Sequence, residues 1–310
     1  MPSPSPTAPP DVVRRADLLS PADLAQLGGL EVISKRVVDG FLLGVHRSPR
    51  RGLSAEFAEL RAYRPGDDLR HVDWRMVGRS DRFFVKQFEE DTHLGAYILL
   101  DVSGSMAWSS DPESLPTKLW YGKLMAAALG LLLFRQGDRV GLGPFDHETR
   151  EWLPARGGGR HQAEFLRRVA SLEARGESRA EGVLRESALR LRRPGMVILI
   201  SDLLMDASET ATALRYLAHR GHQVVVLHLL DPGERELEGT GTLRYRDPET
   251  GDELQVPVGE VRAAYREAVD SALLEWRRAL VPAGVDYLIA DTSRPFGPAL
   301  RDLLRSRARR

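Results

Sequence analysis

The sequence predicts an α/β protein built on a doubly wound, mostly parallel sheet with helices on both faces. From residue 94 onward, short apolar runs bounded by polar turns alternate with amphipathic helical segments. Strands that are separated in this way by helices are typical of a parallel sheet. The chain of 310 residues, 42% hydrophobic and 28% charged, is long enough for one such domain with an additional module.

The expected elements follow one another along residues 94–310. The strands are expected at 94–101, 138–145, 150–155, 196–202, 223–231 and 285–291. The helices are expected at 117–135, 161–173, 180–192, 206–219 and 259–280, with an Arg-rich helix at the end of the chain. The segment at about 241–258 interrupts this rhythm, because two strand-like runs flank the turn-forming stretch "DPETGDE". We therefore expect a hairpin inserted into the α/β domain.

The N-terminal part of the chain does not follow the alternating pattern. Residues 1–18 are rich in Pro and Ser and are expected to be a disordered lead rather than a signal peptide. Residues 19–93 are expected to form a small β-containing module, in which "RFFVKQFEE" reads as a strand and Pro65-Gly66 suits the centre of a type II turn. The domain that follows is expected to span 94–310.

Composition excludes several classes of function. Lys plus Arg and Asp plus Glu number 44 each, so net charge gives no reason to expect a nucleic-acid partner. The chain has no cysteine, which excludes disulfides, thiolate metal sites and cysteine nucleophiles. The longest apolar run, "LMAAALGLLLF", is shorter than the about 17–25 residues that span a bilayer. We therefore expect a soluble, cytoplasmic protein without direct membrane insertion.

The stretch "YILLDVSGSM" is the main candidate for a functional site. Asp101 ends an apolar strand, and Ser103 and Ser105 follow at alternate positions; Asp202 ends a second apolar strand in "VILISDLL". Ligands of doubly wound sheets bind beyond the carboxyl ends of the strands, where both carboxylates should meet. Carboxylates and hydroxyls are hard oxygen ligands, which suit Mg²⁺ or Mn²⁺. The alternative is that the two serines only cap a helix.

The spacing Asp-x-Ser-x-Ser, with a later Asp at a second strand end, resembles the metal-ion-dependent adhesion site of von Willebrand factor A domains. The resemblance implies a von Willebrand factor A-like fold and a further hydroxyl ligand, a threonine in that family, from an intermediate loop. The loop in this chain is "ARGESRAEGVL", whose only hydroxyl belongs to Ser178. Ser178 is therefore the residue that the resemblance assigns to the site, with serine in place of threonine.

The stretches "YRPGDDLRHVDW" and "VKQFEE", followed by a strand and Asp-x-Ser-x-Ser, are similar to the domain-of-unknown-function 58 family over about residues 30–300. The resemblance implies a protein encoded beside MoxR-type AAA+ ATPases and taken to be their partner or adaptor. The same stretch contains Asp73, Trp74 and Arg75. These residues either brace the small module in ion pairs or form an exposed surface for a partner, since Trp and Arg are enriched in binding hot spots.

We therefore expect a non-enzymatic, metal-dependent protein-binding module, whose partner is a MoxR-type AAA+ ATPase or its client. The metal ligands, for Mg²⁺ or Mn²⁺, are expected to be Asp101, Ser103, Ser105, Ser178 and Asp202. One alternative is a metal-independent adaptor that binds through the module containing Trp74. Another is a haloacid-dehalogenase-like phosphohydrolase, but that chemistry needs an aspartate at the position of Ser103.

Overall fold

The computed structural model describes residues 29–45, 60–63, 83–86, 95–176, 180–191, 193–237, 239–246 and 253–295. Contacts divide the chain into two compact units. The larger unit comprises Met1–His46 and Leu94–Arg310, and the smaller comprises Arg47–His93. In the smaller unit the strands β1 (Leu60–Ala62) and β2 (Phe84–Lys86) pair antiparallel. β2 lies inside the stretch "RFFVKQFEE" that was expected to be a strand.

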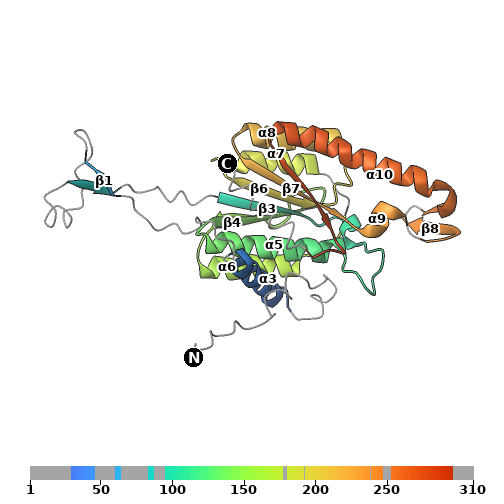
Figure 1. The fold of residues 1–310 in the computed structure, drawn as a ribbon, viewed down its shortest axis with the longest axis horizontal. Coiled ribbons are helices and arrows are strands. Elements are labelled where there is room, and N and C mark those ends of the chain that lie inside the picture. The colour runs from blue at the N-terminus through green and yellow to red at the C-terminus, as the bar shows by residue number, and fades with distance from the viewer. Residues whose placement is uncertain are drawn as a thin grey trace, which may run out of the picture. The chain divides into compact units, whose positions relative to one another are not determined.

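The larger unit is built on a six-stranded sheet in the order β10-β7-β6-β3-β4-β5 (Figure 1). Its strands are β3 (Gly95–Asp101), β4 (Arg139–Phe145), β5 (Leu153–Arg156), β6 (Met196–Ser201), β7 (Gln223–Leu230) and β10 (Asp286–Asp291). All neighbouring strands are parallel except β5, which pairs antiparallel with β4 at the edge. Five of the six strands are thus parallel, and β3, the first of the six in the chain, lies inside the sheet.

Helices cover both faces of this sheet (Figure 1). They are α3 (Leu30–Val45), α5 (Lys118–Arg135), α6 (Gly159–Ser171), α7 (Ala180–Arg190), α8 (Ala207–His219) and α10 (Val258–Leu280). Side chains alternate along β3, so Ile98 and Leu100 join the buried cluster with α3, α5 and α6, whereas Leu99 joins the cluster with α7, α8 and α10. The predicted architecture, a doubly wound, mostly parallel sheet with helices on both faces, is confirmed.

Helix α3 packs in the larger unit, although residues 19–93 were expected to form one module. Ile33, Val37 and Val38 of α3 are at most 3% exposed and belong to the same buried cluster as α5. The reason is physical: α5 buries most of its circumference, and α3 supplies the apolar cover that the sheet and α6 leave open.

Short elements complete the larger unit. The strands β8 (Thr242–Arg246) and β9 (Glu253–Pro257) pair antiparallel within the segment 241–258 where a hairpin was expected. No prediction covered α9 (Pro232–Glu236) or the 3-10 helices η2 (Gly104–Ala107) and η3 (Val281–Ala283). The Arg-rich C-terminal helix expected beyond residue 295 lies outside the described residues. No helix in the described ranges is both long enough and apolar enough to cross a membrane.

Candidate metal centre

Every parallel strand of the sheet is completed by an aspartate at its carboxyl end. Asp101 and Asp291 are the last residues of β3 and β10, and the other three directly follow β4, β6 and β7. These three are Asp146, Asp202 and Asp231. Because parallel strands end at the same edge, the five carboxyl groups gather there, where ligands of doubly wound sheets bind.

Asp101 lies at the centre of this edge and is fully buried. Its Oδ1 accepts a hydrogen bond from the Ser103 backbone N–H at 2.9 Å, and its Oδ2 accepts one from the Ser201 hydroxyl at 2.6 Å. Burial, and then repulsion by the neighbouring Asp202 carboxylate, raises the pKa of Asp101 to about 7, although the hydrogen bonds from Ser201 and Ser103 oppose the rise. Two carboxyl groups therefore share a buried region in which positive charge is favourable.

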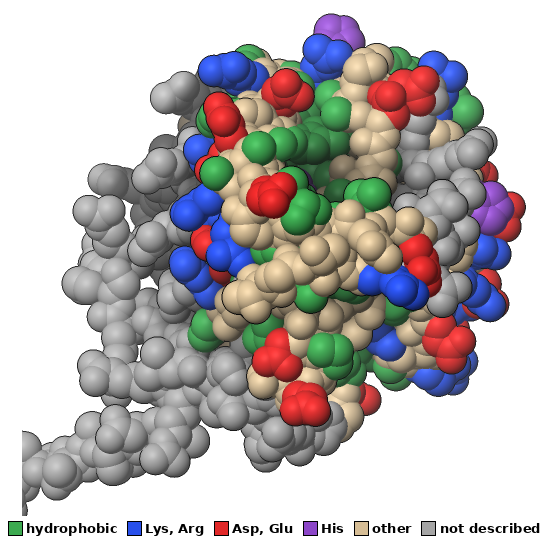
Figure 2. Space-filling view, turned by 90° about the vertical axis from the view of Figure 1, so that its right-hand side faces the viewer, with side chains coloured by type: hydrophobic (Ala, Val, Ile, Leu, Met, Phe, Trp, Pro, Cys, Tyr) green, Lys and Arg blue, Asp and Glu red, His purple; other side chains and the backbone are tan. Residues whose placement is uncertain are grey.

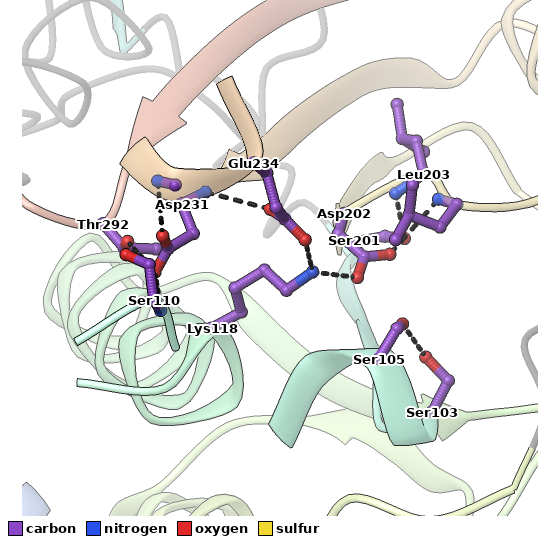
Figure 3. A network of polar contacts seen from close by, with 12 residues as sticks. Ser103, Ser105, Ser110, Lys118, Ser201, Asp202, Leu203, Asp231, Glu234 and Thr292 are labelled. Carbon is purple, nitrogen blue, oxygen red and sulfur yellow. Dashed lines mark hydrogen bonds and ion pairs between the residues drawn. The ribbon is translucent and has the colours of Figure 1, made fainter. Parts of the chain in front are cut away.

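Ser103 and Ser105 place two hydroxyl groups beside each other at the start of η2. Their Oγ atoms are 3.0 Å apart, and both residues are buried (Figure 3). Ser103 is at the N-cap position of η2, but its side chain makes no capping hydrogen bond. Neighbouring oxygens around a six-coordinate Mg²⁺ with bonds of 2.0–2.1 Å are about 3.0 Å apart. At this distance the two hydroxyls hydrogen-bond each other, and the same separation matches that of two neighbouring metal ligands. A capping role for Ser103 does not account for the pair.

Backbone hydrogen bonds hold the loop that follows α6 against the start of η2. The Gly104 N–H donates to the Gly176 carbonyl oxygen at 2.8 Å, and the Arg175 N–H donates to the Val102 carbonyl oxygen at 2.8 Å. Gly176 adopts a φ of +78°, a left-handed conformation that favours glycine. This loop leads to Ser178, which itself lies outside the described residues.

Lys118 supplies a positive charge inside the site. Its side chain is fully buried, and its Nζ donates to Asp202 Oδ2 at 2.7 Å and pairs with Glu234 Oε1 (Figure 3). Burial lowers the pKa of Lys118, but the attraction of the two carboxylates outweighs burial, so the pKa is raised above its ordinary value. The ammonium group therefore stays charged and balances Asp202.

Glu234 is held in place by the capping of α9. The Asp231 side chain accepts a hydrogen bond from the Gly233 N–H at 2.8 Å, and Glu234 Oε2 accepts one from the Asp231 N–H at 3.1 Å. This reciprocal arrangement is a capping box. It directs the other oxygen of Glu234 towards Lys118, and so it joins the end of β7 to the site.

The structure brings together four of the predicted site residues. Asp101, Ser103, Ser105 and Asp202 gather at the edge formed by β3 and β6, while Ser178, Asp73, Trp74 and Arg75 lie outside the described residues. In the part of the chain that the structure describes, no group of three or more His, Cys, Asp or Glu is arranged to hold a metal ion. Any cation here depends on the two serine hydroxyls, with the carboxylates behind them.

Three residues of the cluster were missed by the sequence analysis: Lys118, Ser201 and Glu234. Ser201 could have been found, because it directly precedes Asp202 at the end of a predicted strand. Lys118 and Glu234 gave no local signal, since the ion pair joins residues 116 positions apart. Only four of the 44 basic residues are lysines, but this alone did not indicate a buried one.

The sequence matches one protein family and is similar to uncharacterized mycobacterial proteins. The family described as "Protein of unknown function DUF58" matches residues 59–273. Two relatives are the uncharacterized proteins Mb1516 of Mycobacterium bovis and Rv1480 of Mycobacterium tuberculosis. Each is 32% identical over 252 residues, which cover 80% of this chain and 78% of the relative.

Solved structures with a similar fold have lower sequence identity. The conserved hypothetical protein BatB from Bacteroides thetaiotaomicron is 20% identical, with a TM-score of 0.47, covering 70% of this chain and 100% of its own. The SpRpn10 VWA domain is 12% identical, with a TM-score of 0.41, covering 67% of this chain and 94% of its own.

Proposed function

Because the chain belongs to the DUF58 family and has a von Willebrand factor A-like fold, we propose that it is a non-catalytic protein-binding module that depends on Mg²⁺ or Mn²⁺. The residues that hold the cation in this proposal are Asp101, Ser103, Ser105 and Asp202, with Ser178 as a further ligand. The observation that carries the proposal is the pair of buried serine hydroxyls, 3.0 Å apart, in front of Asp101.

The chemistry of these groups favours a hard divalent cation. Ser103 and Ser105 offer neutral oxygens, and the buried carboxylates of Asp101 and Asp202 supply negative charge behind them. A bound Mg²⁺ retains water and leaves a coordination position that an acidic side chain of a partner can fill. Asp101 already accepts hydrogen bonds at both oxygens, so its contribution is electrostatic and through water-mediated contacts.

Lys118 is compatible with this proposal. Asp202 Oδ2 pairs with the ammonium group, while its Oδ1 accepts a hydrogen bond from the Leu204 N–H at 3.2 Å. Asp202 is therefore held in a fixed orientation. Because Asp202 and Glu234 already balance the Lys118 ammonium, the divalent cation supplies the positive charge that an acidic partner requires.

The partner that we propose is a MoxR-type AAA+ ATPase or its client protein. This proposal rests on the family resemblance of the stretch containing Asp73, Trp74 and Arg75. The competing function is a metal-independent adaptor that binds through those same residues.

A thermal-shift titration tests metal dependence first. Wild type and Asp101→Ala are heated with Mg²⁺, with Mn²⁺ and with EDTA. A ligand that binds only the folded protein raises the free energy of unfolding by about 2.7 kcal/mol when its concentration is 100 times its dissociation constant. We therefore expect the metal to raise the melting temperature of wild type and not that of Asp101→Ala.

Asp206→Ala is the matched control. Asp206 caps α8 through the Glu209 N–H at 2.8 Å, so this variant loses a carboxylate and some stability but keeps the metal response. An equal metal response in wild type and Asp101→Ala, or none in wild type, contradicts the proposal. Retained partner binding in EDTA, together with loss of binding in Trp74→Ala, supports the competing adaptor.

A further inference from the structure

An apolar pocket opens beside the candidate metal centre, with a volume of about 620 Å³. It lies between η2, α9, the β8–β9 hairpin and the first turns of α10. On this face of the molecule, hydrophobic side chains gather around a hollow (Figure 2). The volume falls within the roughly 300–1,000 Å³ that is typical of ligand pockets.

We propose that this pocket receives a bulky apolar side chain that neighbours the acidic residue in the same partner segment. The inference rests on the proposed function, because it assigns the acid to the metal centre and its neighbour to the pocket. Together the two contacts define the partner as a polypeptide segment with an acidic residue close to a residue such as Leu, Phe or Met.

The pocket is continuous with the metal centre. Ser105 and Lys118 belong to both, since Ser105 pairs with Ser103 and Lys118 pairs with Asp202, while both also line the pocket. A side chain that reaches the Ser105 hydroxyl therefore has its sequence neighbours at the pocket entrance. This continuity favours one segment that occupies both places.

The walls of the pocket select for an apolar group. They come from the loop after β6, from the end of α9, from the hairpin and from α10, and include Leu204, Leu237, Val256, Val261, Ala264 and Tyr265. Leu204 and Leu254 are 60% and 66% exposed at the pocket, so large apolar surface is left in contact with water. Covering such surface is the main favourable contribution in most associations.

The charged groups of the pocket and the Tyr265 hydroxyl are already paired within the protein. Glu234 is neutralised by Lys118, and the Tyr265 hydroxyl donates to the Glu234 carbonyl oxygen at 2.7 Å. A charged side chain in the pocket would therefore lose its hydration without gaining an unpaired ion of opposite charge. The charge of the partner belongs at the metal centre, and its apolar neighbour belongs in the pocket.

Selection from a displayed library of random peptides tests the inference. The full-length chain is immobilised in Mg²⁺ as wild type, Ala264→Trp, Ala263→Trp and Asp101→Ala. Ala264→Trp fills the pocket, whereas Ala263 is an exposed alanine of the same helix that does not line the pocket and serves as the matched control. Circular dichroism verifies that each variant is folded.

Wild type and Ala263→Trp are expected to enrich peptides with Asp or Glu close to a bulky apolar residue. Replacing that apolar residue of a selected peptide with Ala should raise the dissociation constant of the peptide about tenfold or more. Ala264→Trp should lose only the apolar preference, and Asp101→Ala only the acidic preference. Should Ala264→Trp fail to fold, Leu254→Ser, a change at an exposed position, replaces it and should weaken binding in the same direction.

The outcomes separate the two proposals. Acidic peptides without apolar preference overturn the pocket inference and leave the proposed function standing. Apolar peptides that bind equally in EDTA overturn the proposed function and the joint motif, and no enrichment overturns the inference. Self-association of wild type that Ala264→Trp abolishes would identify a second copy of the chain as the occupant instead.

Discussion

At the scale of single residues, Lys118 is the group on which the charge balance of the site depends. A buried carboxylate, Asp202, and a partly buried one, Glu234, have the same ammonium as their partner. Removing one member of a buried ion pair leaves the other charge desolvated, at a cost larger than the pair contributes as a whole. Lys118 therefore determines whether the strand ends of β6 and β7 tolerate being buried together.

The substitution Lys118→Met keeps most of the side-chain volume and removes the charge. We expect it to lower the free energy of unfolding by about 3–5 kcal/mol in EDTA, because Asp202 is left uncompensated. Urea denaturation followed by circular dichroism measures the change. The control is Lys35→Met, since Lys35 forms an exposed ion pair with Glu31 at 2.7 Å, worth at most about 1 kcal/mol. Equal effects of the two substitutions would show that the burial of Lys118 contributes nothing.

The residues of the candidate site differ in how far sequence could predict them. Asp101, Ser103, Ser105 and Asp202 were predictable because each lies at or just after the end of an apolar strand, and strand ends meet at one edge. Lys118 and Glu234 were not, because a helix start and a distant loop come together only through tertiary packing. Local sequence patterns do not indicate a contact between residues that are 116 positions apart in the chain.

At the scale of elements, most helices and strands were predictable and the way they pack was not. The helix expected at 117–135 is α5, Lys118–Arg135, with Thr117 as its N-cap accepting from the Trp120 N–H at 3.2 Å. The reversed direction of β5 at the sheet edge left no signal in its four residues. Likewise, α3 has the apolar pattern of a packed helix, but nothing in that pattern identifies α5 as its neighbour.

The packing of α5 against α6 depends on a glycine. A Cβ placed on Gly130 would lie 2.4 Å from the ring of Phe165, which is fully buried. In contrast, a Cβ on Gly182 of α7 would meet nothing within 4 Å. The two glycines therefore test close packing and helix propensity separately.

We expect Gly130→Ala to destabilise the protein by about 1–3 kcal/mol through overpacking. Gly182→Ala should stabilise it by up to about 1 kcal/mol, because alanine restricts the unfolded chain and favours the helix. Urea midpoints of both variants, with unchanged slopes, measure these effects. A stabilising Gly130→Ala would contradict the helix–helix distance in the structure.

At the scale of the whole molecule, the larger unit is assembled from two separate stretches of chain. Its sheet begins at β3, but α3, encoded before the smaller unit, covers α5. Burial of Ile33, Val37 and Val38 contributes about 1.5–3 kcal/mol for each side chain. The boundary of the larger unit is therefore not the start of its sheet.

Two shortened chains test this assembly. In one, residues 47–93 are replaced by a flexible Gly/Ser linker of about 20 residues; in the other, the chain starts at residue 94. We expect the chain with the linker to keep a cooperative thermal transition. The chain that starts at residue 94 should lose several kcal/mol of its free energy of unfolding and expose apolar surface, which dye binding detects. If the chain starting at residue 94 is as stable as the first, α3 is dispensable and the module boundary expected from the sequence is the better one.

The interior position of β3 also has a consequence during synthesis. β3 is the first strand of the large sheet to leave the ribosome, and one of its two neighbours, β6, begins only at Met196. At about 5–20 residues per second, roughly 5–20 s pass before that neighbour is made. During this interval the nascent chain carries an apolar strand with one unpaired edge. An unpaired apolar edge is a site of aggregation, so we expect this interval to be the one in which the nascent chain depends most on protection from other chains.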